Sequence, residues 1–369
     1  MKKILAVLLA AVCALSLSLI GCGGDSAGDG LKIVIVTSPS GVDDASFNQD
    51  NYEGITAFVN SHPGSSVQTI RELNEANAIA AVEAVMADYD VIVTPGFQFA
   101  GIYELAVKNP EKYFILVDAF PEDAERNEAT ADNIYAMLFA EEESGFFAGI
   151  AAAMETTSGK VASVHGMAYP SNVNYQFGFE SGVNYANKHL GTNAVIVSLP
   201  SYGGTDVLGN NVGGNYVGSF SDEANGKIVG EALLAQGVDV IFVAAGASGN
   251  GVFTAVKENG NAMVIGCDVD QYDEGASGSA NIVLTSALKV MSPNVTKQLE
   301  AINNGSFQGG NYTLTAETDS TGYVSASGRQ QLSEPTSAAL QEAYGLVKDG
   351  SIVPASNFNG STPSNFKGL

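Results

Sequence analysis

Short apolar runs alternate with segments of helical periodicity along most of the chain, beginning at Leu31. Apolar runs bounded by Ser, Pro or Gly are typical of buried strands, and apolar residues that recur every three to four positions are typical of helices. Strands that alternate with helices of this length form right-handed crossovers and a mostly parallel sheet with helices on both faces. The pattern predicts strands at 31–37, 66–71, 90–95, 113–118 and 133–139, and helices from 48 and at 75–87, 101–108 and 141–154.

The same alternation restarts at residue 160. A chain of 369 residues exceeds what one core usually serves. We therefore predict an α/β fold of two doubly wound lobes that are joined by crossover segments and face each other across a cleft. The second set of strands and helices is expected, in turn, at 160–165, 173–187, 193–200, 222–235, 239–245, 251–259 and 262–268. The expected boundaries are 31–140 for lobe 1, with about 275–310 returning to it, 141–274 for lobe 2, with about 311–355 completing it, and 356–369 for a surface tail.

Two segments are less regular. The Gly/Asn-rich stretch 201–218 is either an ordered Ω-type loop or a mobile flap, and the pattern does not choose between them. After the second lobe's last strand we expect a strand at 282–286, a helix at 293–303, a hairpin over 312–324 and a helix at 334–348.

The N-terminus has the charged, apolar and small-residue regions of a secretory signal, expected at 1–21. Lys2 and Lys3 precede an apolar run, and the sequence Leu-Ile-Gly before Cys22 resembles a bacterial lipoprotein box. We expect Cys22 to carry a lipid that anchors the chain at the extracytoplasmic face of the cell membrane, with 22–30 as a flexible tether. The alternative is a transmembrane anchor, because the apolar run is near the ~20 residues that a spanning helix needs.

The chain is strongly acidic, which restricts its ligands. Its net charge is −24, and removal of Lys2 and Lys3 leaves 14 basic against 40 acidic residues, or −26. Such a surface repels phosphate, so we expect no nucleic-acid partner and favour a neutral or cationic small molecule. Cys267 would be the one thiol besides Cys22, and it lies in an apolar run where a buried, inert thiol is expected. With no paired histidines or thiols, we expect no catalytic residues, no metal and no cofactor.

Polar side chains gather where predicted strands end, which is where open parallel sheets bind ligands. Asp43, Asp44 and Asn48 follow the first strand. The Gly-rich run 246–251 follows another, but it matches none of the nucleotide-binding or nucleophile motifs, although its backbone suits a polar ligand group. These positions are candidate binding residues.

Asp268 ends the strand at 262–268 and Asp270 follows it, and the two carboxylates invite a metal interpretation. The calcium-loop pattern fails at Tyr272. We favour Asp268 as an acceptor for ligand hydroxyls over a purely structural carboxylate or a metal ligand. Lys289 is a lone cation near these acids, and the alternative for it is an ordinary surface lysine.

Several blocks together resemble the basic membrane protein family of bacterial lipoproteins, also called purine-nucleoside receptors, which are substrate-binding components of ABC importers. The likeness runs from Leu31 to about Lys289. The blocks read DDASFNQ at 43–49, YEG at 52–54, EEE at 141–143, GFFAG at 145–149, GSFSD at 218–222, AAG at 244–246, GNGVF at 249–253 and GCDVDQ at 266–271. For the acidic triplet at 141–143 taken alone, we favour a stabilising position in a first helical turn. The resemblance implies the same fold, of periplasmic-binding-protein type I.

The resemblance also implies roles for single residues. Asp43 or Asp44, together with Asn48, would contact a purine base, and Asp118 would hydrogen-bond its edge. Two aromatic rings would stack on the base, and three residues would hold the ribose. The stacking residues are Tyr52 and Phe220, and the ribose residues are Gly246, Asp268 and Lys289. For each of these two aromatic residues, the alternative is that the side chain packs in the hydrophobic core.

The implied function is a monomeric, lipid-anchored protein that binds a purine nucleoside between two lobes and delivers it to an ABC permease. Two departures from the family qualify this. The stretch 202–216 resembles an insertion long enough to cover the cleft, and Ala247 stands where the family commonly has a glycine. The alternatives are binding of a sugar or another neutral solute, a nucleoside hydrolase or phosphorylase, and a surface sensor or adhesin lipoprotein.

Overall fold

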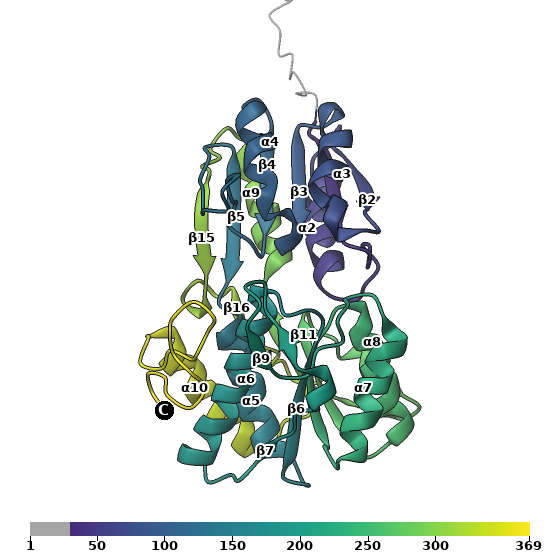
Figure 1. The fold of residues 1–369 in the computed structure, drawn as a ribbon, viewed down its shortest axis with the longest axis vertical. Coiled ribbons are helices and arrows are strands. Elements are labelled where there is room, and N and C mark those ends of the chain that lie inside the picture. Colours follow the sequence, from purple (N-terminus) through teal and green to yellow (C-terminus); the bar gives the residue numbers. More distant parts are fainter. Residues whose placement is uncertain (1–29) are drawn as a thin grey trace, which may run out of the picture.

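The computed structural model describes residues 30–369 as two α/β lobes, one above the other in Figure 1. The expectations for the signal segment and for Cys22 lie outside the described residues. Within them, no helix is long and apolar enough to cross a membrane. Each lobe is built on a six-stranded sheet, so the predicted fold class is confirmed.

The first sheet has the strand order β2-β1-β3-β4-β5-β15, and all its neighbouring strands are parallel. In β1, Ile33 and Ile35 pack on one face while Val34 and Val36 pack on the other. Both faces are therefore buried, which is why this strand is a continuous apolar run. The strands are β1 (Lys32–Thr37), β2 (Ser66–Arg71), β3 (Val91–Pro95), β4 (Tyr113–Val117), β5 (Ile134–Phe139) and β15 (Gly310–Leu314).

The second sheet repeats this arrangement in the order β7-β6-β10-β11-β14-β16. Only its last pair, β14 with β16, is antiparallel. The strands are β6 (Lys160–His165), β7 (Val195–Ile196), β10 (Val240–Ala244), β11 (Met263–Asp268), β14 (Val283–Lys289) and β16 (Thr321–Tyr323). The carboxyl ends of the parallel strands in the two sheets face each other across the middle of the molecule (Figure 1).

Helices cover both faces of each sheet. In the first lobe α2 (Phe47–Ser61) and α9 (Met291–Asn303) pack on one face, and α3 (Ala78–Val85) and α4 (Tyr103–Lys108) on the other. In the second lobe α5 (Glu141–Glu155), α6 (Pro170–His189) and α10 (Glu334–Lys348) pack on one face, and α7 (Glu223–Ala235) and α8 (Ala247–Asn259) on the other.

Glycines let α5 and α6 approach each other closely. A Cβ atom on Gly149 would lie 2.1 Å from the carbonyl oxygen of Phe179, and one on Gly182 would lie 2.1 Å from that of Phe146. Larger residues would force the helices apart. This contact fixes α6, whose first turn reaches the space between the lobes.

The chain crosses between the lobes three times, and two of the crossings differ from the predicted boundaries. β14 lies in the second sheet beside β11, so the return to lobe 1 begins only at α9. β15 pairs with β5 in the first sheet while β16 pairs with β14 in the second, so the hairpin predicted over 312–324 is wrong. Partners distant in the sequence determine these placements, and local periodicity does not report them.

Two irregular segments are also packed. The stretch 201–218 contains a short antiparallel pair, β8 (Gly204–Thr205) and β9 (Asn211–Gly213), and Tyr216 is buried beside it. The tail beyond residue 355 is irregular, as expected, but Phe366 is buried in the core of the second lobe. The tail therefore contributes to packing.

Candidate functional site

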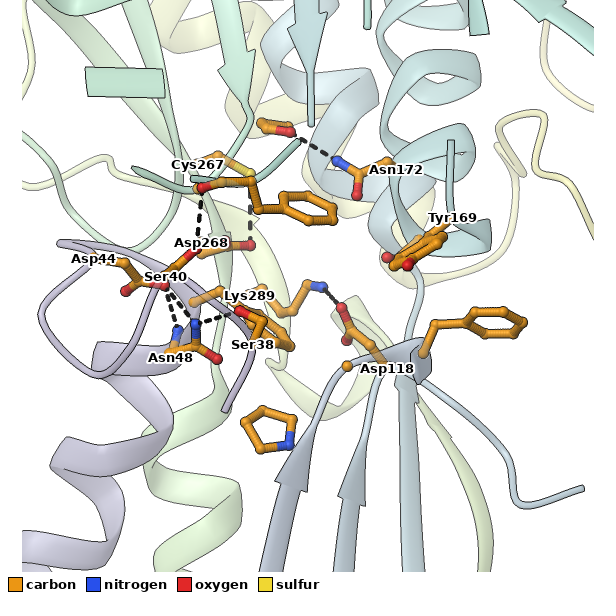
Figure 2. A pocket seen from close by; sticks show the side chains of 18 of the residues that line it. Ser38, Ser40, Asp44, Asn48, Asp118, Tyr169, Asn172, Cys267, Asp268 and Lys289 are labelled. Atoms are coloured by element: carbon orange, nitrogen blue, oxygen red, sulfur yellow. Dashed lines mark hydrogen bonds and ion pairs between the residues drawn. The ribbon is translucent and has the colours of Figure 1, made fainter. Parts of the chain in front are cut away.

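A cavity lies between the carboxyl ends of the two sheets and holds about 590 Å³, its mouth included. Figure 2 shows the side chains that surround it. The lining residues are Ser38, Ser40, Asp44, Phe47, Asn48, Pro95, Gly96, Phe97, Gln98, Asp118, Tyr169, Ser171, Asn172, Tyr175, Phe220, Ala244, Gly246, Cys267, Asp268 and Lys289.

Seven of the nine predicted ligand-binding residues line this cavity. They are Asp44, Asn48, Asp118, Phe220, Gly246, Asp268 and Lys289. Asp43 is exposed on the loop before α2, and Tyr52 lies one turn further along this helix, packed against the core of the first lobe. Because α2 presents its first turn to the cavity, Phe47 rather than Tyr52 is the aromatic residue that α2 contributes there.

Asp44 holds the start of α2 in place. Its carboxylate accepts hydrogen bonds from the backbone N–H groups of Ser46, Asn48 and Gln49 at 3.0–3.1 Å, and another from the Asn48 side chain. Burial raises the pKa of Asp44, and these backbone donors oppose the shift. The carboxylate thus satisfies free N–H groups at a helix start and orients Asn48 toward the cavity.

The two lobes place equivalent aspartates at the cavity. Asp118 follows β4 and Asp268 ends β11, and each strand is the fourth in its sheet, counted from β2 or β7. Both residues have left-handed backbones, with φ of 63° and 68°. Non-glycine residues seldom adopt this conformation, and it is concentrated at functional sites. The shared strand position and backbone conformation of Asp118 and Asp268 therefore mark both strand ends as parts of one site.

Lys289 lies buried between carboxylates, so it is not a surface lysine. Its Nζ is 2.6 Å from Asp118 Oδ2 and 3.1 Å from Glu141 Oε1, and the rings of Phe47 and Tyr175 lie 5.2 and 5.4 Å from it. Glu141 is 1% exposed, so the helix-start interpretation missed its ion pair. Since an ammonium has three donors, one N–H remains for a ligand.

The buried charges perturb each other. Burial raises the pKa of Asp118 to about 7, although Lys289 opposes the shift. Burial by itself would lower the pKa of Lys289, but the charges of Asp118 and Glu141 outweigh it and raise the pKa above its usual value. Asp118 therefore titrates close to neutral pH while Lys289 stays charged.

Asp268 connects the two lobes. Its Oδ1 accepts a hydrogen bond of 3.0 Å from the Tyr175 hydroxyl in its own lobe, and its Oδ2 accepts one of 2.9 Å from the Ser46 hydroxyl in the first lobe. Each oxygen of a carboxylate can accept two hydrogen bonds. Asp268 can therefore accept from ligand hydroxyls as well.

Two buried acceptors at the cavity have no hydrogen-bond partner within residues 30–369: Asn48 Oδ1 and Asp118 Oδ1. The Asn48 amide nitrogen donates to Ser38 and Asp44, which determines the orientation of its oxygen. Unsatisfied buried acceptors are costly, so both oxygens are available to accept hydrogen bonds from a bound ligand.

Sequence reasoning missed four aromatic residues that line the cavity. They are Phe47, Phe97, Tyr169 and Tyr175. The Tyr169 ring lies 5.4 Å from that of Phe97 in the first lobe and 5.9 Å from that of Phe220 in the second. Tyr169 shortly follows the end of β6, and its position after a strand end could have identified it as a candidate binding residue.

The site is suited to binding rather than to bond making. Cys267 is buried, and burial raises the pKa of its thiol well above the usual value. No group of three or more His, Cys, Asp or Glu side chains in the described part of the chain could hold a metal ion. Acceptors, one buried cation and aromatic rings are the groups that hold a flat molecule rich in hydrogen-bond donors.

The fold and the site together define a two-lobed solute-binding protein. The family model described as ABC transporter substrate-binding protein PnrA-like (Bmp) matches residues 31–198 and 210–342. The chain belongs to this family, so it is the extracytoplasmic solute-binding component of an ABC transporter and not an enzyme. Residues 199–209 fall between the matched segments and overlap only the first half of the insertion predicted at 202–216.

Similar proteins are consistent with this assignment. The chain is 29% identical over 297 residues to the "ABC transporter nucleoside-binding protein BmpA" of Lactococcus lactis, covering 76% of this chain and 77% of that one. It is 28% identical over 350 residues to the "CD4+ T-cell-stimulating antigen" of Listeria innocua, covering 89% of both. A solute-binding protein of an ABC transporter system from Aeropyrum pernix K1 has the same fold, with a TM-score of 0.73 at 24% identity, over 89% of this chain and 94% of that one.

Proposed function

We propose that this protein binds a purine nucleoside between its lobes and presents it to its ABC permease. The proposal is carried by two buried acceptors that have no hydrogen-bond partner among residues 30–369, Asn48 Oδ1 and Asp118 Oδ1, in a cavity with aromatic rings from both lobes. A purine is flat and presents N–H donors at its edge, so these acceptors and rings fit it. The name of the Lactococcus lactis relative supports the same ligand class.

The charge of the cavity disfavours a phosphorylated ligand. Asp44, Asp118 and Asp268 line it together with a single cation, Lys289, which already has carboxylate partners. A phosphate would add negative charge to this set in a region of low dielectric constant. A nucleoside is therefore preferred over a nucleotide.

The two ends of the ligand are divided between two groups of residues. Asn48 and Asp118 accept hydrogen bonds from the base, with Phe47 and Phe220 beside the ring. Asp268, the third N–H of Lys289 and the backbone at Gly246 hold the ribose, whose neighbouring hydroxyls suit a carboxylate. Asp43 and Tyr52 have no direct role in this arrangement.

Membrane attachment forms a separate part of the proposal. The signal-like segment 1–21 is removed and Cys22 carries a lipid, so that the lobes stand outside the membrane as a monomer. Metabolic labelling with a radioactive fatty acid tests this, with Cys22→Ala as the control. Equal label in both proteins would exclude Cys22 as the attachment site.

A thermal-shift screen of purine and pyrimidine nucleosides, free bases, sugars and a nucleotide tests the ligand. At about 100 times its dissociation constant a ligand stabilises by roughly 2.7 kcal/mol. Purine nucleosides should raise the melting temperature and ribose should not. Equal shifts with ribose and inosine would indicate a sugar-binding protein, and a flat response to all nucleosides would reject the proposal. Chromatography of inosine after incubation should show no hydrolysis.

A further inference from the structure

Away from the crossover segments and the buried Lys289 cluster, the described lobes touch through side-chain hydrogen bonds in two places. One is the loop 40–46, on the side of the cavity where Ser40 and Asp44 lie in Figure 2. There Ser40 donates to the Phe220 carbonyl at 3.0 Å, Ser46 donates to Asp268, and Gln271 donates to the Ala45 carbonyl at 3.1 Å.

The other contact lies on the opposite side of the cavity, where Figure 2 shows Tyr169. The Tyr169 hydroxyl, from the second lobe, donates to Glu75 Oε2 in the first lobe. Its ring meets Phe97 of the first lobe at 5.4 Å. Tyr169 is thus the one residue of the described second lobe that donates a side-chain hydrogen bond to the first lobe on this side.

Tyr169 also separates two hollows. Phe97, Gln98 and Tyr169 line the central cavity and also a neighbouring outer groove that Glu75 and Arg126 help to form. The wall between the cavity and the groove is therefore made of side chains from both lobes.

Both partners are held firmly by their own lobes. Tyr169 immediately precedes α6, and Pro170 begins that helix. The preceding Ala168 packs with Tyr216, whose hydroxyl donates to Gln176 on α6 at 2.7 Å. The stretch 201–218 therefore supports the Tyr169 side of the contact through Tyr216, without lining the cavity. Glu75 follows Asn74, whose side chain caps the short turn at 75–77.

We propose that Tyr169 and Glu75 form a clasp that stabilises the closed arrangement of the lobes and shuts the passage between the cavity and the outer groove. Tyr169 acts as a positioning residue through its hydroxyl, in addition to its ring at the cavity. The clasp should also slow ligand dissociation, and that expectation rests on the proposed nucleoside binding. The clasp itself does not, because it involves only side chains of this protein.

The test measures lobe closure directly. Spin labels on Lys108→Cys in lobe 1 and Glu231→Cys in lobe 2 report the distance between the lobes by pulsed electron resonance. Cys13 and Cys22 are replaced by alanine so that they take up no label, and Cys267 is protected by its burial. Tyr169→Phe keeps the ring and removes the hydroxyl, and Glu75→Ala removes the acceptor.

Each variant should lower the closed-to-open ratio roughly tenfold, near the lower end for a hydrogen bond to a charged group. The double variant should be no worse than either single one, because both remove the same bond. Tyr185→Phe on α6 and Glu83→Ala on α3 should leave the ratio unchanged, since neither side chain makes an interlobe bond within the described residues.

Several outcomes would overturn the clasp: unchanged ratios in Tyr169→Phe and Glu75→Ala, additive losses in the double variant, or no closed population in the labelled parent protein without added ligand. Dissociation of inosine, followed by stopped flow, should accelerate about tenfold in the same two variants. If no nucleoside binds but the ratios shift as expected, the proposed function fails while the clasp stands.

Discussion

Replacing Asp268 by alanine should weaken a nucleoside much more than its free base. The structure adds a complication, because Asp268 also accepts the Ser46 hydroxyl from the opposite lobe at 2.9 Å. Asp268→Ala therefore removes three things: the acceptor for the ribose hydroxyls, the Ser46 bond that helps to close the lobes, and the acceptor of the Tyr175 hydroxyl in its own lobe. Ser46→Ala removes only the second, and it serves as the matched control.

The two losses have different magnitudes for the two ligands. Loss of a hydrogen bond that involves a charged group costs about 1.5 to 3 kcal/mol. Loss of the Ser46–Asp268 bond should weaken guanosine and guanine by the same factor, since closure does not depend on the ribose. Loss of the ribose acceptor should weaken guanosine alone by a further 10- to 150-fold, by the relation of about 1.4 kcal/mol to a factor of ten.

Isothermal titration calorimetry of wild type, Ser46→Ala and Asp268→Ala with guanosine and guanine measures these effects. The preference for guanosine over guanine should survive in Ser46→Ala and fall at least tenfold in Asp268→Ala. A full preference retained in Asp268→Ala would remove this residue from the ribose site. A preference that falls equally in both variants would show that Asp268 acts through closure alone.

Three further predictions test other parts of the site. Lys289→Met should lower the free energy of unfolding in urea by about 3–5 kcal/mol, because Asp118 and Glu141 lose their buried partner; a change below 1 kcal/mol would contradict the buried ion pairs. Because the pKa of Asp118 is about 7, its acceptor gains a proton as the pH falls, so nucleoside affinity should drop by up to about tenfold per pH unit below 7; the same slope in Asp118→Asn would assign it to another group. Phe220→Ala should weaken nucleosides by about 1–3 kcal/mol in calorimetry through lost stacking, by analogy with bases on aromatic side chains; Tyr52→Ala, outside the cavity, should not, and equal losses would place Tyr52 at the ligand.

Much of the site could be predicted because parallel strands bring their carboxyl ends to one edge of a sheet. Asp268, Gly246 and the nearby cation Lys289 were found from strand ends, and the resemblance added Asp118 and Phe220. The resemblance assigned Tyr52 to stacking, whereas the cavity lining contains Phe47 and not Tyr52; helical periodicity alone does not say which turn of α2 faces the cavity. The capping contacts of Asp44 determine this, and they make Phe47 the residue at the cavity.

The sequence by itself determined the two α/β lobes. Strand and helix periodicities are local properties of the chain, and the chain is longer than one hydrophobic core usually serves. The tertiary structure decided which groups meet between the lobes. Ser46 lies 222 residues from Asp268, and Glu75 lies 94 from Tyr169. Such pairs depend on how the crossovers set one sheet against the other, and side chains that far apart leave no periodic trace in the sequence.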